Sequence, residues 1–228
     1  MNNNLGISKM NKVIKLISII GFSVVFSSCT IHVVAHGNSG DVSLLFGRID
    51  VDSGSTVGDL SSVNGGIDIN DGATAGEVET VNGGIEIGDN VQLESAETVN
   101  GSIEVGNNIQ LKKSLETVNG SIFVKAKGAI GKNIETVNGD IHITQVTVNQ
   151  DIKTTNGDIE LSDNSVVKGD IVIKDNNSWF SDATRDKPVL EIDKTSSVLG
   201  VIHLHRSVEL KIADGAKVGE IKYHYKRK

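Results

Sequence analysis

The sequence predicts an all-β chain, folded as a single-stranded parallel β-helix (a solenoid) of about ten coils, with three short strands in each coil of about 18–19 residues. Three observations lead to this prediction. Asn-Gly pairs recur at a nearly constant interval, aliphatic residues recur at the same interval, and apolar and polar residues alternate within each short stretch. A single coil cannot bury its own apolar face, so neighbouring coils must complete the core.

Columns of aliphatic residues mark the strands of each coil. The first column follows the Asn-Gly glycines by two residues, and its members are Ile67, Ile85, Ile103, Ile122, Ile141 and Ile159. Ile49 extends this column one step back. The second column comprises Val42, Leu60, Val78, Ala96, Leu115, Ile134, Ile152, Ile171, Ile202 and Ile221. A looser third column is expected at Val91, Ile109, Ile130, Val148 and Val166.

Each Asn-Gly pair is expected to form a corner between two strands. Asparagine and glycine accept left-handed backbone angles at low cost, as a sharp turn requires. Stacked coils also place the asparagines above one another, where their amides can hydrogen-bond along a column. We therefore predict a turn ladder at Asn64, Asn82, Asn100, Asn119, Asn138 and Asn156. A similar ladder is expected at Thr80, Thr98, Thr117 and Thr136.

One interval of the second column, between Ile171 and Ile202, is clearly longer than all the others. It predicts an insertion loop near 175–188 that interrupts an otherwise regular stack. Loops that leave a regular scaffold often carry function, so Trp179 and Phe180 are candidate binding residues. The alternative is a flap whose aromatic rings cover a thin part of the core.

The start of the chain has the pattern of a secretory signal. Three lysines precede the apolar run "LISIIGFSVVF", which is too short for a membrane-spanning helix. The following "FSSC" resembles the lipobox of bacterial lipoproteins, with Phe26 in place of the usual leucine. The resemblance implies cleavage before Cys29, lipid on Cys29 as the link to a membrane, and a place in the cell envelope. Because Thr30 follows, it also implies the outer membrane.

Cys29 is the only cysteine of the chain. A secreted protein with an unpaired thiol is unusual, and lipidation accounts for this residue. The alternative is a stray thiol after a plain signal peptide. We therefore predict a lipoprotein signal peptide at 1–28, a lipidated N-terminus and linker at 29–40, and the β-helix at 41–228.

Composition indicates an acidic protein without a nucleic-acid partner. The chain has 22 Lys and Arg against 29 Asp and Glu, and loss of residues 1–28, with three lysines and no acid, leaves 19 against 29, a net charge of −10. Nucleic-acid phosphates require a basic surface instead.

We recognise no phosphate loop or catalytic triad, and expect no cofactor. The basic tail "YHYKRK" should discourage strand pairing at the last coil, which predicts a monomer.

Four segments of the chain resemble the repeats of a family of adhesin-like domains of unknown function, namely "VNGGIDI", "VNGGIEI", "VNGSIEV" and "TNGDIEL". The resemblance covers roughly residues 42–225 and implies a repeat fold without transferable active-site residues. The words "GDIVI" and "GAKVGEI" also resemble bactofilins, which are polymerising cytoskeletal β-helices. Bactofilins usually lack a cleaved signal, so they are the second choice.

Acidic residues form two columns at the same period. One column reads Asp50, Asp68, Glu86, Glu104, Phe123, His142 and Glu160, and the other reads Glu79, Glu97, Glu116 and Glu135. The first alternates with inward aliphatics and must point outward, which makes Glu86 and Glu104 candidate binding residues. Divalent cations could relieve the repulsion of stacked carboxylates, but a solvated, solubilising surface is the favoured interpretation.

Three histidines lie near the C-terminus. His203 and His205 flank Leu204, and the period places His224 beside His205. Without a further ligand, we interpret them as solvated and expect no metal site.

The first hypothesis for the whole chain is a non-enzymatic envelope lipoprotein, a binding or structural module for an envelope protein or glycan. The alternatives are a self-assembling scaffold and a polysaccharide-active enzyme.

Overall fold

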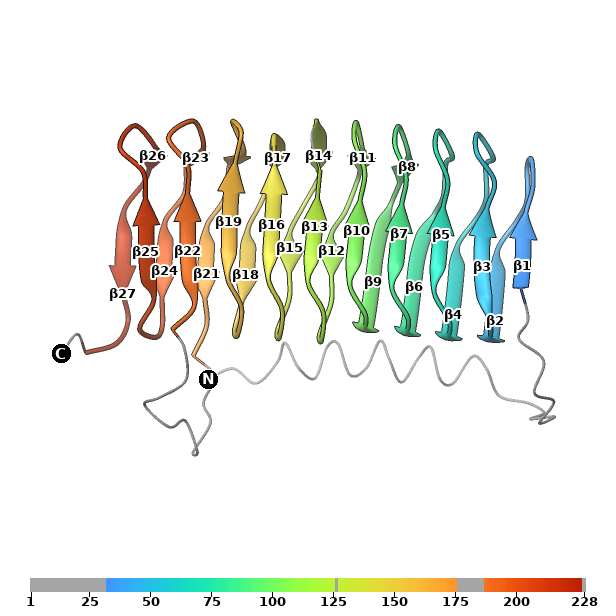
Figure 1. Cartoon of the computed structure of the whole chain (residues 1–228), viewed down its shortest axis with the longest axis horizontal. Coiled ribbons are helices and arrows are strands. Elements are labelled where there is room, and N and C mark those ends of the chain that lie inside the picture. Colours follow the sequence, from blue (N-terminus) through green and yellow to red (C-terminus); the bar gives the residue numbers. More distant parts are fainter. Residues whose placement is uncertain (1–31, 126, 176–186, 227–228) are drawn as a thin grey trace.

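The computed structural model describes residues 32–125, 127–175 and 187–226, which form 27 strands wound into one parallel β-helix (Figure 1). The strands belong to three sheets along the axis of the stack, and every pairing between neighbouring strands is parallel. The predicted fold class is therefore confirmed. This part of the chain contains no helix that could cross a membrane.

From β7 (Ile85–Ile87) onward, each coil passes through sheets A, B and C in that order, whereas the first three coils have only isolated bridges at the position of sheet B. Sheet A contains β1 (His32–Ala35), β3 (Arg48–Val51), β5 (Ile67–Ile69), β7 (Ile85–Ile87), β10 (Ile103–Val105), β13 (Ile122–Val124), β16 (Ile141–Thr144), β19 (Ile159–Ser162), β22 (Val189–Ile192) and β25 (Glu209–Ile212). Sheet B contains β8 (Gln92–Leu93), β11 (Gln110–Leu111), β14 (Gly128–Ile130), β17 (Val146–Val148), β20 (Val166–Val167), β23 (Ser197–Val198) and β26 (Lys217–Val218). Sheet C contains β2 (Val42–Phe46), β4 (Leu60–Asn64), β6 (Glu77–Asn82), β9 (Ser95–Asn100), β12 (Leu115–Glu116), β15 (Ile134–Glu135), β18 (Ile152–Thr154), β21 (Ile171–Ile173), β24 (Ile202–Leu204) and β27 (Ile221–Tyr223).

Two of the predicted columns form the core. In sheet A, Ile67, Ile85 and Ile103 are direct register partners with no exposed surface. The second column is stacked in sheet C over its whole predicted length, from the pair Val42–Leu60 to the pair Ile202–Ile221. Each aliphatic side chain packs on its counterpart in the next coil, so the apolar face of one coil is buried by its neighbours.

The first strand begins earlier than the sequence predicted. Strand β1 lies inside 29–40, the segment expected to be a linker, and it pairs with β3 in register from His32–Arg48 to Ala35–Val51. Ala35 is buried. The exposure of side chains alternates along this short stretch, "HVVA", but its sequence does not alternate polar and apolar residues and no Asn-Gly corner precedes it.

The third column was wrong by two residues at Ile130 and Val148, and by one residue at Val166. The structure pairs Ile130 with Leu111 rather than with Ile109, and Val167 rather than Val166 points inward. Gly128 pairs with Val146 in the file that Ile109 occupies in the preceding coil. Because Gly128 interrupts this file of aliphatic residues, the spacing in the sequence pointed to Ile130, two residues later.

The long interval between Ile171 and Ile202 leaves the register of the stack unchanged. These two residues pair directly, and Ile159 pairs with Leu190, so the coils on the two sides of the insertion are adjacent. The chain between Asp175 and Lys187 lies outside the described residues, together with Trp179 and Phe180.

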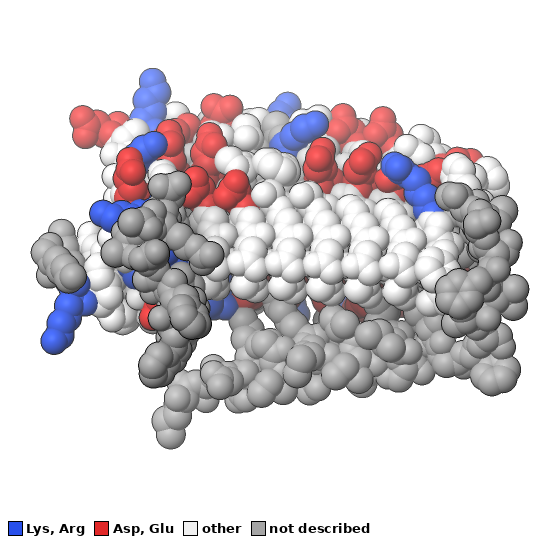
Figure 2. All heavy atoms as spheres, turned by 60° about the horizontal axis from the view of Figure 1, so that its bottom comes forward, with Lys and Arg blue, Asp and Glu red and all other residues white. Residues whose placement is uncertain are grey.

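The Asn-Gly pairs lie where strands of sheet C give way to strands of sheet A. The predicted amide ladder is confirmed over its whole length, with Nδ2 of each asparagine donating to Oδ1 of the preceding one at 2.8–3.0 Å, and its members are Asn64, Asn82, Asn100, Asn119, Asn138 and Asn156. Arg206 extends the ladder beyond Asn156 by donating to its Oδ1 at 2.8 Å. Figure 2 shows an uncharged band along this edge of the helix, with acidic side chains above it.

The physical reason for glycine at this corner differs from the prediction. The ladder asparagines are not among the described residues with positive φ. Glycine is required by close packing, because a Cβ on Gly101 would collide with the carbonyl oxygen of Gly83, and one on Gly120 with that of Gly101. The predicted threonines do stack, with Thr80 and Thr98 as register partners, but their side chains point inward and donate to glycine carbonyl oxygens instead of to one another, as Thr98 does to Gly83 at 2.9 Å.

Candidate functional site

The outward column of sheet A carries the candidate site. Asp68, Glu86, Glu104, Phe123 and His142 occupy successive strands as direct register partners. Each lies between two buried aliphatic residues of its own strand, so alternation turns it towards solvent. The predicted outward direction of Glu86 and Glu104 is confirmed.

An arginine compensates the N-terminal carboxylates of this column. The Nε of Arg48 lies 3.2 Å from Oδ1 of Asp50, and its guanidinium also contacts Asp68. Oε2 of Glu86 is more distant and lies 3.9 Å from Nη2 of Arg48. Exposed ion pairs of this kind contribute little stability, but they reduce repulsion between stacked carboxylates. Negative charge is therefore concentrated further along the column, at Glu86 and Glu104.

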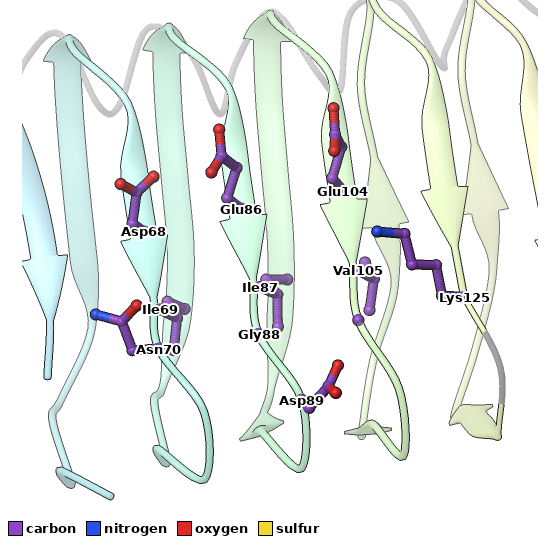
Figure 3. A pocket seen from close by; sticks show the side chains of 11 residues that line it. Asp68, Ile69, Asn70, Glu86, Ile87, Gly88, Asp89, Glu104, Val105 and Lys125 are labelled. Carbon is purple, nitrogen blue, oxygen red and sulfur yellow. The ribbon is translucent and has the colours of Figure 1, made fainter. Parts of the chain in front are cut away.

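A groove runs along the column between β5 and β16. Its first hollow has a volume of about 280 Å³, and its lining includes Asp68, Asn70, Glu86, Asp89, Glu104 and Lys125. Figure 3 shows the three carboxylates of the column in a row on β5, β7 and β10, with Lys125 extending from the chain after β13 towards β10. A second hollow of about 340 Å³ adjoins it, lined by Glu104, Phe123, Val124, Lys125, His142 and Thr144. The two hollows share Glu104 and Lys125.

The second hollow has a flat aromatic floor. The rings of Phe123 and His142 are stacked, with centroids 5.1 Å apart and planes 10° from parallel. His142 is held in this orientation by Glu160, whose Oε2 lies 2.9 Å from His142 Nδ1. The Phe123 residue is 37% exposed, so an apolar face is available beside the carboxylates.

Asp89 lines the groove while it also supports the fold. Its Oδ1 accepts the backbone N–H of Asn107 at 2.7 Å and the side-chain amide of Asn107 at 3.0 Å. These hydrogen bonds, the backbone bond foremost, lower the pKa of Asp89 and keep the carboxylate charged. The groove edge is therefore negatively charged and fixed by the next coil.

The second acidic column lies on a different surface. Glu79, Glu97, Glu116 and Glu135 are register partners in sheet C. Glu135 is buried and its Oε1 accepts from Nζ of Lys174 at 2.7 Å. The two columns thus do not combine into one acidic site.

The structure brings together Glu86 and Glu104 but does not test the other candidate binding residues. Cys29, Trp179 and Phe180 lie outside the described residues. Sequence inspection missed Phe123, His142 and Lys125 as members of the site. The signal was present, because the first two occupy the outward column and were seen only as interruptions of it.

Among the described residues, no group of three or more histidine, cysteine and carboxylate side chains is placed to hold a metal ion. The chain matches no protein-family model, no curated protein and no solved structure. Its function must therefore be inferred from the chemistry of its own surface.

The groove combines three kinds of contact. Carboxylates of Glu86 and Glu104 can accept hydrogen bonds from hydroxyl or amine groups, and the Lys125 ammonium can donate them. The Phe123 ring offers an apolar face of fixed orientation. Because the groove crosses several parallel strands, it suits an extended polar ligand that also has apolar faces.

Proposed function

We propose that this protein is a non-enzymatic, lipid-anchored β-helix of the cell envelope that binds an envelope glycan through the groove on sheet A. The observation that carries the proposal is the row of outward carboxylates ending on the stacked rings of Phe123 and His142. A sugar ring has an apolar face that can lie on Phe123 and hydroxyl groups that can donate to Glu104.

Binding is favoured over catalysis by the exposure of the carboxylates. Glycoside hydrolysis needs an acid and a second carboxylate on either side of one bond, in a site that restricts water. The side chain of Glu86 is 67% exposed, and Glu104 is exposed on the adjacent strand. Both carboxylates stand in an open row along the sheet rather than across a closed cleft.

The binding proposal is tested with an array of bacterial envelope glycans and the full chain carrying Cys29→Ser. We expect Phe123→Ala and Glu104→Ala each to weaken binding about tenfold, equivalent to about 1.4 kcal/mol. Glu191→Ala is the matched control, because Glu191 is an exposed outward residue of the same sheet beyond the groove. Equal binding by the variants and the control, or binding to envelope protein alone, would contradict the proposal.

The membrane anchor is proposed from the lipobox resemblance alone. Labelling of growing bacteria with a lipid precursor should mark the wild-type chain and leave a Cys29→Ala variant unlabelled. The wild type should also fractionate with the outer membrane. A labelled Cys29→Ala variant, or a wild type that is never labelled, would remove the anchor from the proposal without affecting the groove.

A self-assembling scaffold is the second candidate, favoured by the last coil. Leu210, Ile212, Val218 and Ile221 are only partly buried there, whereas Ile192 and Leu204 of the preceding coil have no exposed surface. An end of this kind could stack on another copy. Lys211, Lys217 and Lys222 surround it and oppose such contact, so we favour a monomer. Sedimentation velocity over a hundredfold concentration range distinguishes the two, because a scaffold would form progressively larger species.

A further inference from the structure

Three imidazole rings cluster on the outer face of sheet C, near the C-terminal end of the stack. His203 lies on β24, His205 follows it, and His224 follows β27 in the next coil. The predicted neighbourhood of His205 and His224 is confirmed, since their ring centroids are 4.3 Å apart and their planes differ by 9°. This cluster is on a different sheet from the groove and is independent of it.

Two nitrogens of the cluster face each other. Nδ1 of His203 lies 3.0 Å from Nε2 of His224. Both side chains are near the surface, and the side chain of His203 is 25% exposed. This is a hydrogen-bond distance, with one of the two nitrogens donating to the other. A metal ion that binds both nitrogens needs the His224 tautomer with its hydrogen on Nδ1, which leaves a lone pair on Nε2.

A carboxylate holds His203 from behind. Oδ2 of Asp170 lies 3.5 Å from Nε2 of His203, while Oδ1 of Asp170 accepts the backbone N–H of Val201 at 2.7 Å. The carboxylate is therefore fixed by the next coil, and it favours the proton on Nε2 of His203. That tautomer leaves the lone pair on Nδ1, towards His224. A carboxylate behind a histidine is the usual support of a metal-binding imidazole.

We propose that His203 Nδ1 and His224 Nε2 bind one divalent transition-metal ion, with Cu²⁺ preferred to Zn²⁺. Two nitrogens each about 2.0–2.1 Å from a metal are about 2.9 Å apart at a right angle and about 3.3 Å apart at the tetrahedral angle. The observed hydrogen-bond separation of 3.0 Å is close to both values, so only a small movement of either ring would bring the two nitrogens to one metal ion. Cu²⁺ is preferred because nitrogen sites generally bind it more tightly than the other divalent ions of the first transition row, Zn²⁺ included.

The protein supplies two ligands, and water completes the coordination shell. This agrees with the lack of a three-residue group among the described residues. His205 stacks on His224 more closely than His203 does, with ring centroids 4.3 Å rather than 5.2 Å apart, and we do not assign it as a ligand. It acts instead as a positioning residue that holds the His224 ring.

The test uses calorimetric titration of CuCl₂ into the full chain carrying Cys29→Ser, so that no thiol competes for copper. We expect one site per chain and electron paramagnetic resonance hyperfine structure from two imidazole nitrogens. His203→Ala and His224→Ala should each weaken binding at least tenfold, and His203→Gln and His224→Gln provide second variants that keep side-chain bulk. Zn²⁺ should bind more weakly than Cu²⁺.

Matched controls separate ligands from neighbours. His205→Phe keeps the stacked ring without a donor nitrogen, and His32→Ala removes a histidine at the opposite end of the stack; both should leave affinity unchanged. Asp170→Asn should weaken binding about 10–100-fold, as loss of a supporting carboxylate does. Unchanged copper affinity in folded His203 and His224 variants would overturn the proposal, as would equal losses in His32→Ala.

Discussion

Two corners of the coil use similar residues for different physical reasons. At the corner between sheets C and A, the glycines following the ladder asparagines pack against the carbonyl oxygens of the preceding coil. At the corner between sheets A and B, φ is +71° at Gly72 and +59° at Asn90, in the left-handed region. The glycines after the ladder asparagines are therefore required because they have no Cβ, whereas Gly72 and Asn90 are required for a left-handed backbone angle.

This difference explains how strictly each corner repeats in the sequence. Left-handed angles are tolerated by several residue types, and the second corner includes Lys127 at +62° and Gln145 at +56°. No larger residue can enter the glycine file without moving a neighbouring coil. The first corner accordingly retains glycine in coil after coil, as Gly65, Gly83, Gly101, Gly120, Gly139 and Gly157.

The largest effect is expected for Gly101→Ala. The added methyl group would collide with the carbonyl oxygen and carbon of Gly83, which belong to the backbone and cannot rotate away. We expect the free energy of unfolding to fall by about 3 kcal/mol, at the upper end of the usual cost of overpacking a core. Equilibrium urea denaturation measures this change.

Gly72→Ala is its matched control at the other corner. A Cβ there meets nothing closer than 3.9 Å, so the change imposes only a left-handed alanine. The expected cost is about 1–2 kcal/mol. If Gly72→Ala destabilised the chain more than Gly101→Ala, the distinction between the corners would be wrong.

Asn119→Ala should have a smaller effect. It removes the amide that donates to Asn100 and accepts from Asn138, and the ladder is open to solvent on one side. Water can replace part of what is lost, so we expect destabilisation of about 1 kcal/mol. Asn119→Ser, whose hydroxyl cannot span both neighbours, should behave like alanine; full stability in both variants would show that the ladder contributes nothing.

A carboxylate supports the second corner in a later coil and makes it sensitive to pH. Burial opposes the charge of Asp193, but hydrogen bonds from Ser196, Asp163 and Thr195 outweigh it and lower the pKa of Asp193 to about 2. Because the folded pKa lies below the unfolded value, the stabilisation is present above pH 3.8 and is lost as pH falls towards 2.

Asp193→Asn should therefore reduce stability at pH 7, by less than about 1 kcal/mol because the group is partly exposed. The difference between the two proteins should shrink between pH 4 and pH 2. Urea denaturation at several pH values measures it, and a difference that stayed constant down to pH 2 would contradict this role for the carboxylate.

The smallest effect is expected for Gln145→Gly. Glycine relieves a left-handed angle of +56° at an exposed position, but it also increases the entropy of the unfolded chain. The two contributions nearly cancel, and the change in unfolding free energy should stay within about 0.5 kcal/mol. A large loss would show that the Gln145 side chain, rather than its backbone angle, supports this corner.

Periodicity predicted the fold because the core is a set of straight files. Ile67, Ile85 and Ile103 could be aligned by counting, since each file repeats the step of the coil. Counting failed at Gly128, where a file loses its side chain, and at β1, which precedes the first Asn-Gly pair. Counting also could not tell which glycines are required by close packing and which by a left-handed backbone angle. A collision with the preceding coil depends on three-dimensional distance, which the spacing of residues does not give.

The site was only partly predictable. Glu86 and Glu104 followed from alternation, which determines the face of a strand. The stacking of Phe123 on His142 depends on ring orientation, and the reach of Lys125 towards β10 depends on the path of the chain after β13. The pair formed by His203 and His224 similarly required rotamers that spacing does not specify.

The most direct test is a pulsed electron paramagnetic resonance distance between spin labels at Glu86→Cys and Glu191→Cys, in a Cys29→Ser chain. These outward positions are five strand spacings apart in sheet A, across the insertion. Continuous stacking therefore predicts a narrow distribution centred at about 24 Å. A broad distribution, or a maximum more than about 10 Å longer, would show that the coils do not follow one another in register and would contradict the β-helix.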